Sequence, residues 1–392
     1  MKRKTLADVL GRALQRLVIV ALAIGLALGV GPALAAHAAT ITVTTTADSG
    51  PGSLRQAIQA AAPGDTINFS VTGAITLTSG ELFITKNLNI HGPGATSLAI
   101  SGDDASRVVR VGPGTTVTIT DITIRNGYTY AGAGIENNGA LMLINVAVRD
   151  NNSESSGGGI LNYGPLNLTN VTISGNTASG AHPLGGGGIA HFGGAATLNN
   201  VTISGNSAIN TGGVGNGSSG GGISVYNPAT LNLNNVTIVN NLASASVADL
   251  GAGGGMDASQ ADPVNFKNTL IAGNTSSGAG PDCAGTLTSQ GYNLVQDTAG
   301  CTIAGDTTGN IIGQDPLLGA LTNNGGATQT HSLLPGSPAI DAGNPAAPGN
   351  GGNACEASDQ RGVARPQGTR CDIGAYEWWQ PVAWIYLPLI LR

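Results

Sequence analysis

Hydrophobic and polar residues alternate in short runs along most of the chain, and these runs recur as near copies of one phrase. The clearest copies are LNLTNVTISGN (166–176), TLNNVTISGN (197–206) and LNLNNVTIVNN (231–241). In the last copy Leu231 and Leu233 fall on one side and Asn232 on the other, the period-two pattern of a β-strand with one buried face. Further copies are VTITDITIRNG (117–127), LMLINVAVRDNN (141–152) and NFKNTLIAGN (265–274). Every repeat therefore predicts two short strands.

The junction between these two strands holds Asn or Asp in every copy. Asn and Asp tolerate left-handed turn geometry, and an Asn amide can bond to the equivalent residue of the next repeat. We interpret the column as a structural ladder. The N-V-T triplets at 170, 200 and 235 match a glycosylation acceptor, but their Asn is the ladder residue. The column contains Asp121, Asn145, Asn170, Asn200, Asn235 and Asn268.

Glycine-rich text such as GGGI (157–160) and GGGGI (185–189) precedes a third strand in each repeat. Glycine supplies the positive φ that a sharp corner needs. Because the repeats are nearly identical, each strand's best neighbour is its own copy one coil on, running parallel to it. A single repeat cannot bury its own apolar face, so the coils must stack. The predicted fold is all-β, a single right-handed parallel β-helix spanning 67–312.

Both ends of such a helix need covering, because a terminal coil exposes unpaired backbone. The segment GSLRQAIQAAAPGD reads as a short amphipathic helix with Leu54, Ala57, Ile58 and Ala61 on one face, and it makes 39–66 an N-terminal cap. The irregular, Pro- and Gly-rich stretch 313–377 is predicted to be a C-terminal cap.

The four cysteines indicate disulfides, because their number is even and the start of the chain, described next, predicts export. Three pairings are possible. We favour the two that close local loops, Cys283–Cys301 and Cys355–Cys371. A metal site is disfavoured, since no C-x-x-C motif or histidine cluster accompanies these residues.

Residues 1–38 are predicted to be a cleaved signal peptide. A basic start precedes an uncharged run of 14 residues (17–30) and small residues suited to cleavage after Ala35 or Ala38. A retained membrane anchor is the alternative, but the run is shorter than the roughly 20 residues a span needs. No spanning segment is then expected after cleavage, and we expect the protein to be extracellular or on the cell surface.

Composition and charge exclude several partners. Glycine accounts for 62 residues, and charged residues for only 10% of the chain. Without residues 1–38, 11 Lys and Arg remain against 21 Asp and Glu. A chain this acidic is a poor nucleic-acid binder. No Lys-Ser/Thr follows the glycine runs, so a nucleotide site is not expected either. We expect no cofactor, with calcium as the one open possibility.

Several motifs resemble known families. Residues 40–310 resemble the pectate-lyase-like right-handed β-helix superfamily, particularly the repeat of adhesin-type outer-membrane proteins. GSLRQAI resembles the CSLREA-type opening of bacterial surface proteins, with Gly52 in place of the cysteine. The stretches 315–344 and 359–377 resemble the choice-of-anchor Q C-terminal region. The resemblance implies a secreted or surface-held protein and no defined activity. The hydrophobic tail 378–392 is then either a sorting or anchoring signal or a plain cap strand.

One group of charged residues is a weak catalytic candidate. Arg125 and Arg149 occupy the same place on adjacent coils, with Asp150 beside them and Glu136 in a neighbouring strand. Together they could hold a sugar carboxylate or calcium, the chemistry of a polysaccharide lyase. The alternative is a solvated ion-pair cluster, because later coils replace the arginines with uncharged residues such as Ser174.

A second group is a weak candidate for ligand binding. Tyr163, Phe192 and Tyr226 stand three residues after the inward Ile of successive coils and should stack as a ladder, either as a sugar platform or as support for the fold. His191 is interpreted as structural. The corner loops, which lengthen along the axis, are the expected binding surface of a solenoid. Asp257, Asp262 and Asp282 lack the spacing of a calcium site, so the metal remains unknown.

Three functions follow from these patterns. The first is a non-catalytic, adhesin-like protein that binds glycans or extracellular matrix, favoured by the regular repeat and by the scarcity of carboxylates. The second is a polysaccharide lyase or glycoside hydrolase, which would require the charged group to converge in one groove. The third is a purely structural envelope filament.

Overall fold

The computed structural model describes residues 38–379 apart from 181–184, 213–217, 246–250 and 261–263, together with a few positions between 7 and 16. The chain divides into two compact units, Met1–Ala38 and Ala39–Arg392, and the account below concerns the second. Most of the predicted signal peptide, and residues 380–392 of the hydrophobic tail, lie outside the described residues.

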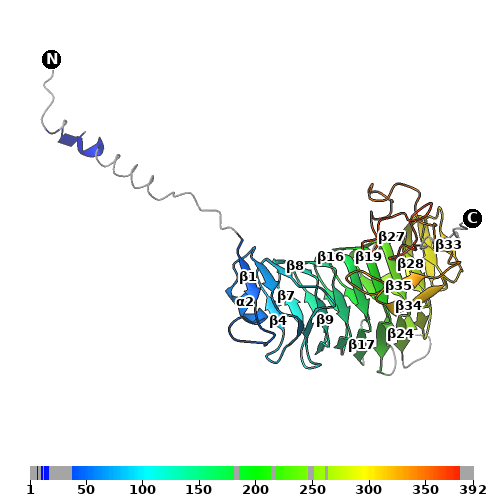
Figure 1. Cartoon of the computed structure of the whole chain (residues 1–392), viewed down its shortest axis with the longest axis horizontal. Helices are drawn as coiled ribbons and strands as arrows, with labels where there is room; N and C mark the ends of the chain where they lie inside the picture. Colours follow the sequence, from blue (N-terminus) through cyan, green and yellow to red (C-terminus); the bar gives the residue numbers. More distant parts are fainter. Residues whose placement is uncertain are drawn as a thin grey trace, which may run out of the picture. The chain divides into compact units, whose positions relative to one another are not determined.

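The second unit is a right-handed parallel β-helix built on one 25-stranded sheet (Figure 1). All pairings within that sheet are parallel, and each strand pairs with its own copy in the adjacent coil; Val171–Ser174, for example, pair with Val201–Ser204 in register. The predicted fold class is therefore confirmed. Its strands form three rows along the helix, and residues of neighbouring strands in a row lie about 4.8 Å apart.

The first row contains β4 (Leu82–Ile84), β7 (Val109–Val111), β11 (Ile135–Asn137), β15 (Ile160–Asn162), β18 (Ile189–His191), β22 (Ile223–Tyr226), β26 (Met256–Gln260), β30 (Cys283–Gln290) and β32 (Cys301–Asp306). The second contains β1 (Thr40–Val43), β2 (Thr66–Phe69), β5 (Leu88–His91), β8 (Thr116–Thr120), β12 (Ala140–Ile144), β16 (Leu166–Ser174), β19 (Ala195–Ser204), β23 (Thr230–Val239), β27 (Val264–Lys267) and the second halves of β30 and β32. The third contains β3 (Gly73–Thr76), β6 (Leu98–Ser101), β9 (Thr123–Arg125), β13 (Ala147–Arg149), the second halves of β16, β19 and β23, and then β28 (Leu270–Ala272), β31 (Leu294–Val295) and β33 (Ile311–Ile312).

The corner loops contain a short strand that the repeat pattern did not predict. These strands form a separate six-stranded parallel sheet of β10 (Tyr128–Thr129), β14 (Asn152–Ser153), β17 (Thr177–Gly180), β20 (Ser207–Asn210), β24 (Leu242–Ala245) and β29 (Thr275–Ser276), beside a pair formed by β21 (Ser218–Ser219) and β25 (Gly251–Ala252). Strands of two to four residues are too short for period-two alternation to be recognised in the sequence.

The interior of the helix is one continuous hydrophobic cluster of stacked Ile, Leu and Val side chains. Helix α2 (Leu54–Ala60) closes the cluster at its first coil. Ser53 is the N-cap and accepts a hydrogen bond from the backbone N–H of Gln56. Leu54, Ala57 and Ile58 are buried against the coil, as the amphipathic pattern predicts.

The C-terminal region begins after β33 and lies along the flank of the third row. Strands β34 (Leu318–Thr322) and β35 (Thr330–Leu333) form an antiparallel pair, and the remainder is irregular. Leu333, Ala339 and Ile373 pack on Val239 and Leu270 in a second hydrophobic cluster. This region therefore covers the side of several coils and does not simply close the last one.

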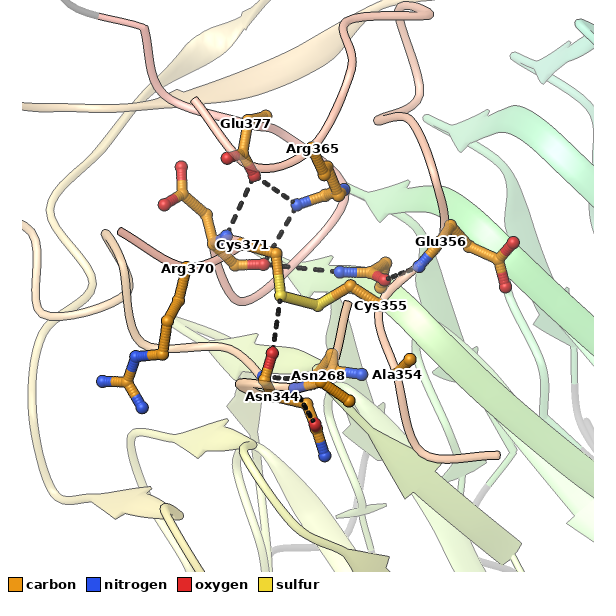
Figure 2. Close-up of a disulfide and its surroundings, with 12 residues drawn as sticks. Asn268, Asn344, Ala354, Cys355, Glu356, Arg365, Arg370, Cys371 and Glu377 are labelled. Carbon is orange, nitrogen blue, oxygen red and sulfur yellow. Dashed lines mark hydrogen bonds and ion pairs between the residues drawn. A yellow bond between two sulfur atoms is a disulfide. The ribbon is translucent and has the colours of Figure 1, made fainter. Parts of the chain in front are cut away.

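Both predicted disulfides form. Cys283 pairs with Cys301 at the end of the β-helix, and Cys355 with Cys371 in the C-terminal region. Close to the second disulfide, Arg365 donates to Glu377 and to the carbonyl of Asp372 (Figure 2). The side chains of Arg365 and Glu377 are both fully buried, so this ion pair is an internal anchor of the C-terminal region.

Candidate functional site

A groove with a volume of about 860 Å³ runs along the third row of strands, in its earlier coils. Its floor consists of small side chains, among them Ala99, Thr123 and Ala147, which stack in register on β6, β9 and β13. One wall is the segment 326–329 of the C-terminal region. The groove is thus the part of this face that the C-terminal region leaves open.

Two arginines lie side by side in the groove. Arg125 and Arg149 are register partners on β9 and β13, so their side chains project from adjacent coils. The Arg149 guanidinium forms an ion pair with Asp150. The Nε atom of Arg125 is buried and has no hydrogen-bond partner. An unpaired buried donor ordinarily costs about 1–3 kcal/mol.

The turn that follows β13 explains why an Asp stands at position 150. Its φ is 55°, and the same place on neighbouring coils holds Asn126, Gly175 and Asn240, also at positive φ. Asp, Asn and Gly are the residues that tolerate this conformation. The turn therefore requires a residue of this kind, and Asp150 supplies a carboxylate to the groove as well.

Glu136 does not join the arginines of the groove, contrary to the grouping expected from the sequence. It lies on β11 in the first row, where it pairs with Arg107 at 2.7 Å and with Arg110 at 3.5 Å. Glu81 completes this cluster through Arg107. The reason is the corner between β9 and β11, which turns the chain from the third row of strands to the first.

The three aromatic residues form a stack on successive coils. The ring centroids of Tyr163 and Phe192 are 5.6 Å apart, and those of Phe192 and Tyr226 are 4.5 Å apart with nearly parallel planes. Burial raises the pKa of Tyr226 to about 12. Because the faces of Phe192 are turned to its neighbours, the stack mainly presents ring edges to solvent. Tyr163, at 48% exposure, is the most open member.

The Asn column predicted from the sequence lies at left-handed turns throughout, with φ between 47° and 57°. Side-chain bonds link its first members: Asn145 donates to Asp121 at 3.1 Å and Asn170 donates to Asn145 at 3.2 Å. From Asn200 onward the column bonds to the C-terminal region: Asn200 donates to the carbonyl of Ser358, and Asn235 donates to the carbonyl of Gly374.

A second Asn column lies in the interior, and sequence reasoning missed it. In it the Nδ2 of one residue donates to the Oδ1 of the next at 2.8–2.9 Å, and backbone N–H groups donate to the same oxygens. The signal was present as the Asn that directly follows the positive-φ turn residue of each repeat, in RDN (149–151), SGN (174–176 and 204–206), VNN (239–241) and AGN (272–274). The column is Asn151, Asn176, Asn206, Asn241 and Asn274, all at most 5% exposed.

The remaining candidate residues that the structure describes form hydrogen bonds within the β-helix. His191 is buried, bonds to Asn162 and to the carbonyl of Thr230, and has a pKa lowered by burial. Asp282 continues the interior column by accepting from Asn274, and burial raises its pKa. Asp257 accepts from the backbone of Ser259, and Asp262 lies outside the described residues. Within the described part of the chain, no three His, Cys, Asp or Glu side chains gather as a metal site.

These features define the class of fold: a right-handed parallel β-helix. Among solved structures the chain is similar to the crystal structure of pectate lyase Pel9A, with a TM-score of 0.52 and 14% identity over 86% of this chain and 96% of that one. At this identity the likeness concerns the fold. No family model and no curated protein matches the sequence. In the described residues no helix is long and apolar enough to cross a membrane.

Proposed function

We propose that this is a secreted or cell-surface protein that binds a glycan chain in the groove without cleaving it, in the manner of an adhesin. The observation that carries the proposal is the pair Arg125 and Arg149 on adjacent coils of an open groove. Guanidinium groups bind carboxylates through two parallel hydrogen bonds. Thr, Ser and Gln side chains along the groove offer partners for sugar hydroxyls, so a glycan with carboxylate substituents fits best.

The composition of the groove supports binding over cleavage. Among the described residues that line it, Asp150 is the only acid, and no Lys or His is present. Hydrolysis of a glycosidic bond ordinarily uses two carboxyl groups. Arginine keeps its proton at physiological pH and is a poor general base. Cleavage of a pectate chain, the activity for which Pel9A is named, is the second candidate, and it rests on the likeness in fold.

The test uses purified residues 39–392 on immobilised polygalacturonate and on a neutral glucan, at low and high salt, with and without calcium. We expect retention on polygalacturonate that weakens with salt, because exposed charges are screened. Arg125→Ala should lose about tenfold or more in affinity, since a charge-assisted hydrogen bond contributes about 1.5–3 kcal/mol.

Arg370→Ala is the matched control, because Arg370 is exposed and points away from the buried cluster of the C-terminal region (Figure 2). It should bind like the wild type. Release of new sugar ends that disappears in Arg149→Ala would replace the binding proposal with the lyase. If no glycan in the panel retained the protein and none released sugar ends, both the binding proposal and the lyase would be contradicted.

A further inference from the structure

A lysine, an asparagine and a glutamate meet where the C-terminal region crosses the late coils. Lys267 on β27 and Asn234 on β23 are register partners, so they stand side by side on adjacent parallel strands. Both face outward, because Phe266 and Leu233 beside them are buried. The segment 352–356 lies over them. The carbonyl of Gly352 accepts a hydrogen bond from Lys267 Nζ, and that of Ala354 accepts one from Asn234 Nδ2.

The carboxamide of Asn234 is held on both sides. Its Oδ1 accepts a hydrogen bond from Asn268 Nδ2 at 3.0 Å, and its Nδ2 donates to Glu356 Oε1 at 2.7 Å. The residue is only 6% exposed. A fixed donor at a carbonyl oxygen stabilises the negative charge that develops there when a nucleophile adds to the carbon.

The surroundings of the Lys267 amine favour its neutral, nucleophilic form. Burial lowers its pKa, and the charge of Glu356 offsets part of that effect. Lowering the pKa increases the fraction of neutral amine, which is the reactive form. The lysine stem has four rotatable bonds and easily spans the roughly 4.8 Å between neighbouring strands. Rotation away from the Gly352 carbonyl can therefore bring Nζ within reach of the Asn234 side chain.

We propose that Lys267 and Asn234 become joined by an intramolecular isopeptide bond, with Glu356 moving the proton. The lone pair of the neutral Nζ attacks Cγ of Asn234, and a C–N bond forms. The bond from Cγ to Nδ2 then breaks. Glu356 takes a proton from Nζ and delivers it to Nδ2, which leaves as ammonia. Nothing is oxidised or reduced, and no co-reactant is needed.

Such a bond would join two coils covalently at the point where the C-terminal region docks. The neighbouring Cys355–Cys371 disulfide closes a loop within that region, whereas an isopeptide bond would link β23 to β27 and resist reducing agents. The inference is independent of glycan binding, since none of the three residues lines the groove.

Peptide mapping of the full secreted chain, reduced and denatured, tests the proposal directly. Lys267 is the only Lys or Arg between Arg149 and Arg361. Trypsin cannot cleave after a lysine whose amine is acylated. We therefore expect one peptide, 150–361, lighter than its sequence by one molecule of ammonia, with fragment ions that place the link between Lys267 and Asn234. Separate peptides 150–267 and 268–361 from the wild type would overturn the proposal.

Two variants establish the roles. Glu356→Gln should fold, as judged by circular dichroism, and return the two separate peptides. Glu154→Gln is the matched control, because Glu154 lies on the corner loop and bonds to Tyr128; it should keep the link. A link that persists in Glu356→Gln would overturn the assignment of Glu356 as the proton carrier.

Discussion

The third row of strands is open over its earlier coils and covered over its later ones, and its outward residues change at the boundary. One register column passes through Thr76, Ser101, Arg125, Arg149 and Ser174, and it continues with Ser204 and Val239 in the covered part. In the covered part the hydroxyl of Ser204 bonds to His331 and Val239 packs in the second hydrophobic cluster. The column thus carries its two arginines in the open part, and small or apolar side chains where it meets the C-terminal region.

The neighbouring column shows the same division. Thr202 donates to Gln360 of the C-terminal region at 2.7 Å, and the hydroxyl of Thr237 accepts from the backbone of Ala375. Thr123, in the open part, instead donates to the carbonyl of Ala95 within the β-helix. The C-terminal region therefore acts as both cover and groove wall, and the length of the groove depends on where that region stops.

Replacing Arg365 is the strongest way to break this division. Its guanidinium is fully buried and donates to Glu377 and to the carbonyls of Asp372 and Gly374. Arg365→Ala leaves Glu377 without its cation, and removing one partner of a buried ion pair costs about 3–5 kcal/mol. We expect a correspondingly lower midpoint in chemical denaturation and exposure of the covered face to proteases. Arg370→Ala, on the exposed surface, should match the wild type; equal stability of the two variants would rule out this anchor.

The interior Asn column should contribute to the free energy of unfolding to a similar extent beneath the open part and beneath the covered part. Asn151 lies beneath the open part and Asn206 beneath the covered part, and the Nδ2 of each donates to the next Asn of the column. Asn206 also accepts from the side chain and the backbone N–H of Asn176, whereas Asn151, the first of the column, accepts from the backbone of Gly127. Asn151→Ala and Asn206→Ala each leave several buried groups unpaired, so each should cost about 3 kcal/mol.

The control for this pair lies in the outer column. Asn200→Gly keeps the left-handed backbone and loses two hydrogen bonds, of 2.9 and 3.4 Å, so it should cost only about 1 kcal/mol. Urea denaturation of the three variants measures the difference. A markedly smaller loss for Asn151→Ala than for Asn206→Ala would mean that the C-terminal region also supports the interior.

The fold could be predicted from the sequence because nearly identical repeats pair with one another, each strand with its own copy in the next coil. Each copy of the phrase specifies its strands, and identity between copies specifies register, as in the alignment of Val171 with Val201. The local disulfides followed from the separations of the cysteines. The flank position of the C-terminal region could not be predicted in this way, because its contacts join Gln360 or Ala375 to residues more than a hundred positions away without any repeat.

The candidate site was predictable only in part, for the same reason. Arg125 and Arg149 align within the repeat, so their proximity followed from the pattern. The groove wall comes from 326–329, which no periodicity connects to those arginines. Glu136 lies outside the groove because the corner before β11 turns the chain into the first row of strands. The glycines of the sequence predict that a corner exists, but they do not give its angle.

The pH dependence of stability should be concentrated in the covered part. Burial, followed by the charge of Glu377, raises the pKa of Asp372 to about 7, above the value of about 3.9 in an unfolded chain. The folded state then holds a proton that the unfolded chain has released, so stability falls as pH rises from about 4 through 7. His331 and His191 act in the opposite sense, because burial lowers their pKa values and the unfolded chain gains protons as pH drops below about 6.5. Between pH 6.5 and 8 the fall in stability therefore comes mainly from Asp372 and its partner Glu377, whose pKa burial also raises.

Across that window the wild type should lose about 1 kcal/mol of stability, a fall of a few degrees in its melting temperature. Asp372→Asn should flatten the profile, because the side chain at this position no longer titrates. A variant in the open part, such as Arg149→Ser, should retain the wild-type slope. Calorimetry at half-unit intervals of pH makes the measurement. A slope that survives in Asp372→Asn and also in the double variant Asp372→Asn, Glu377→Gln would place the titrating group outside the buried cluster, and with it the pH sensitivity outside the covered part.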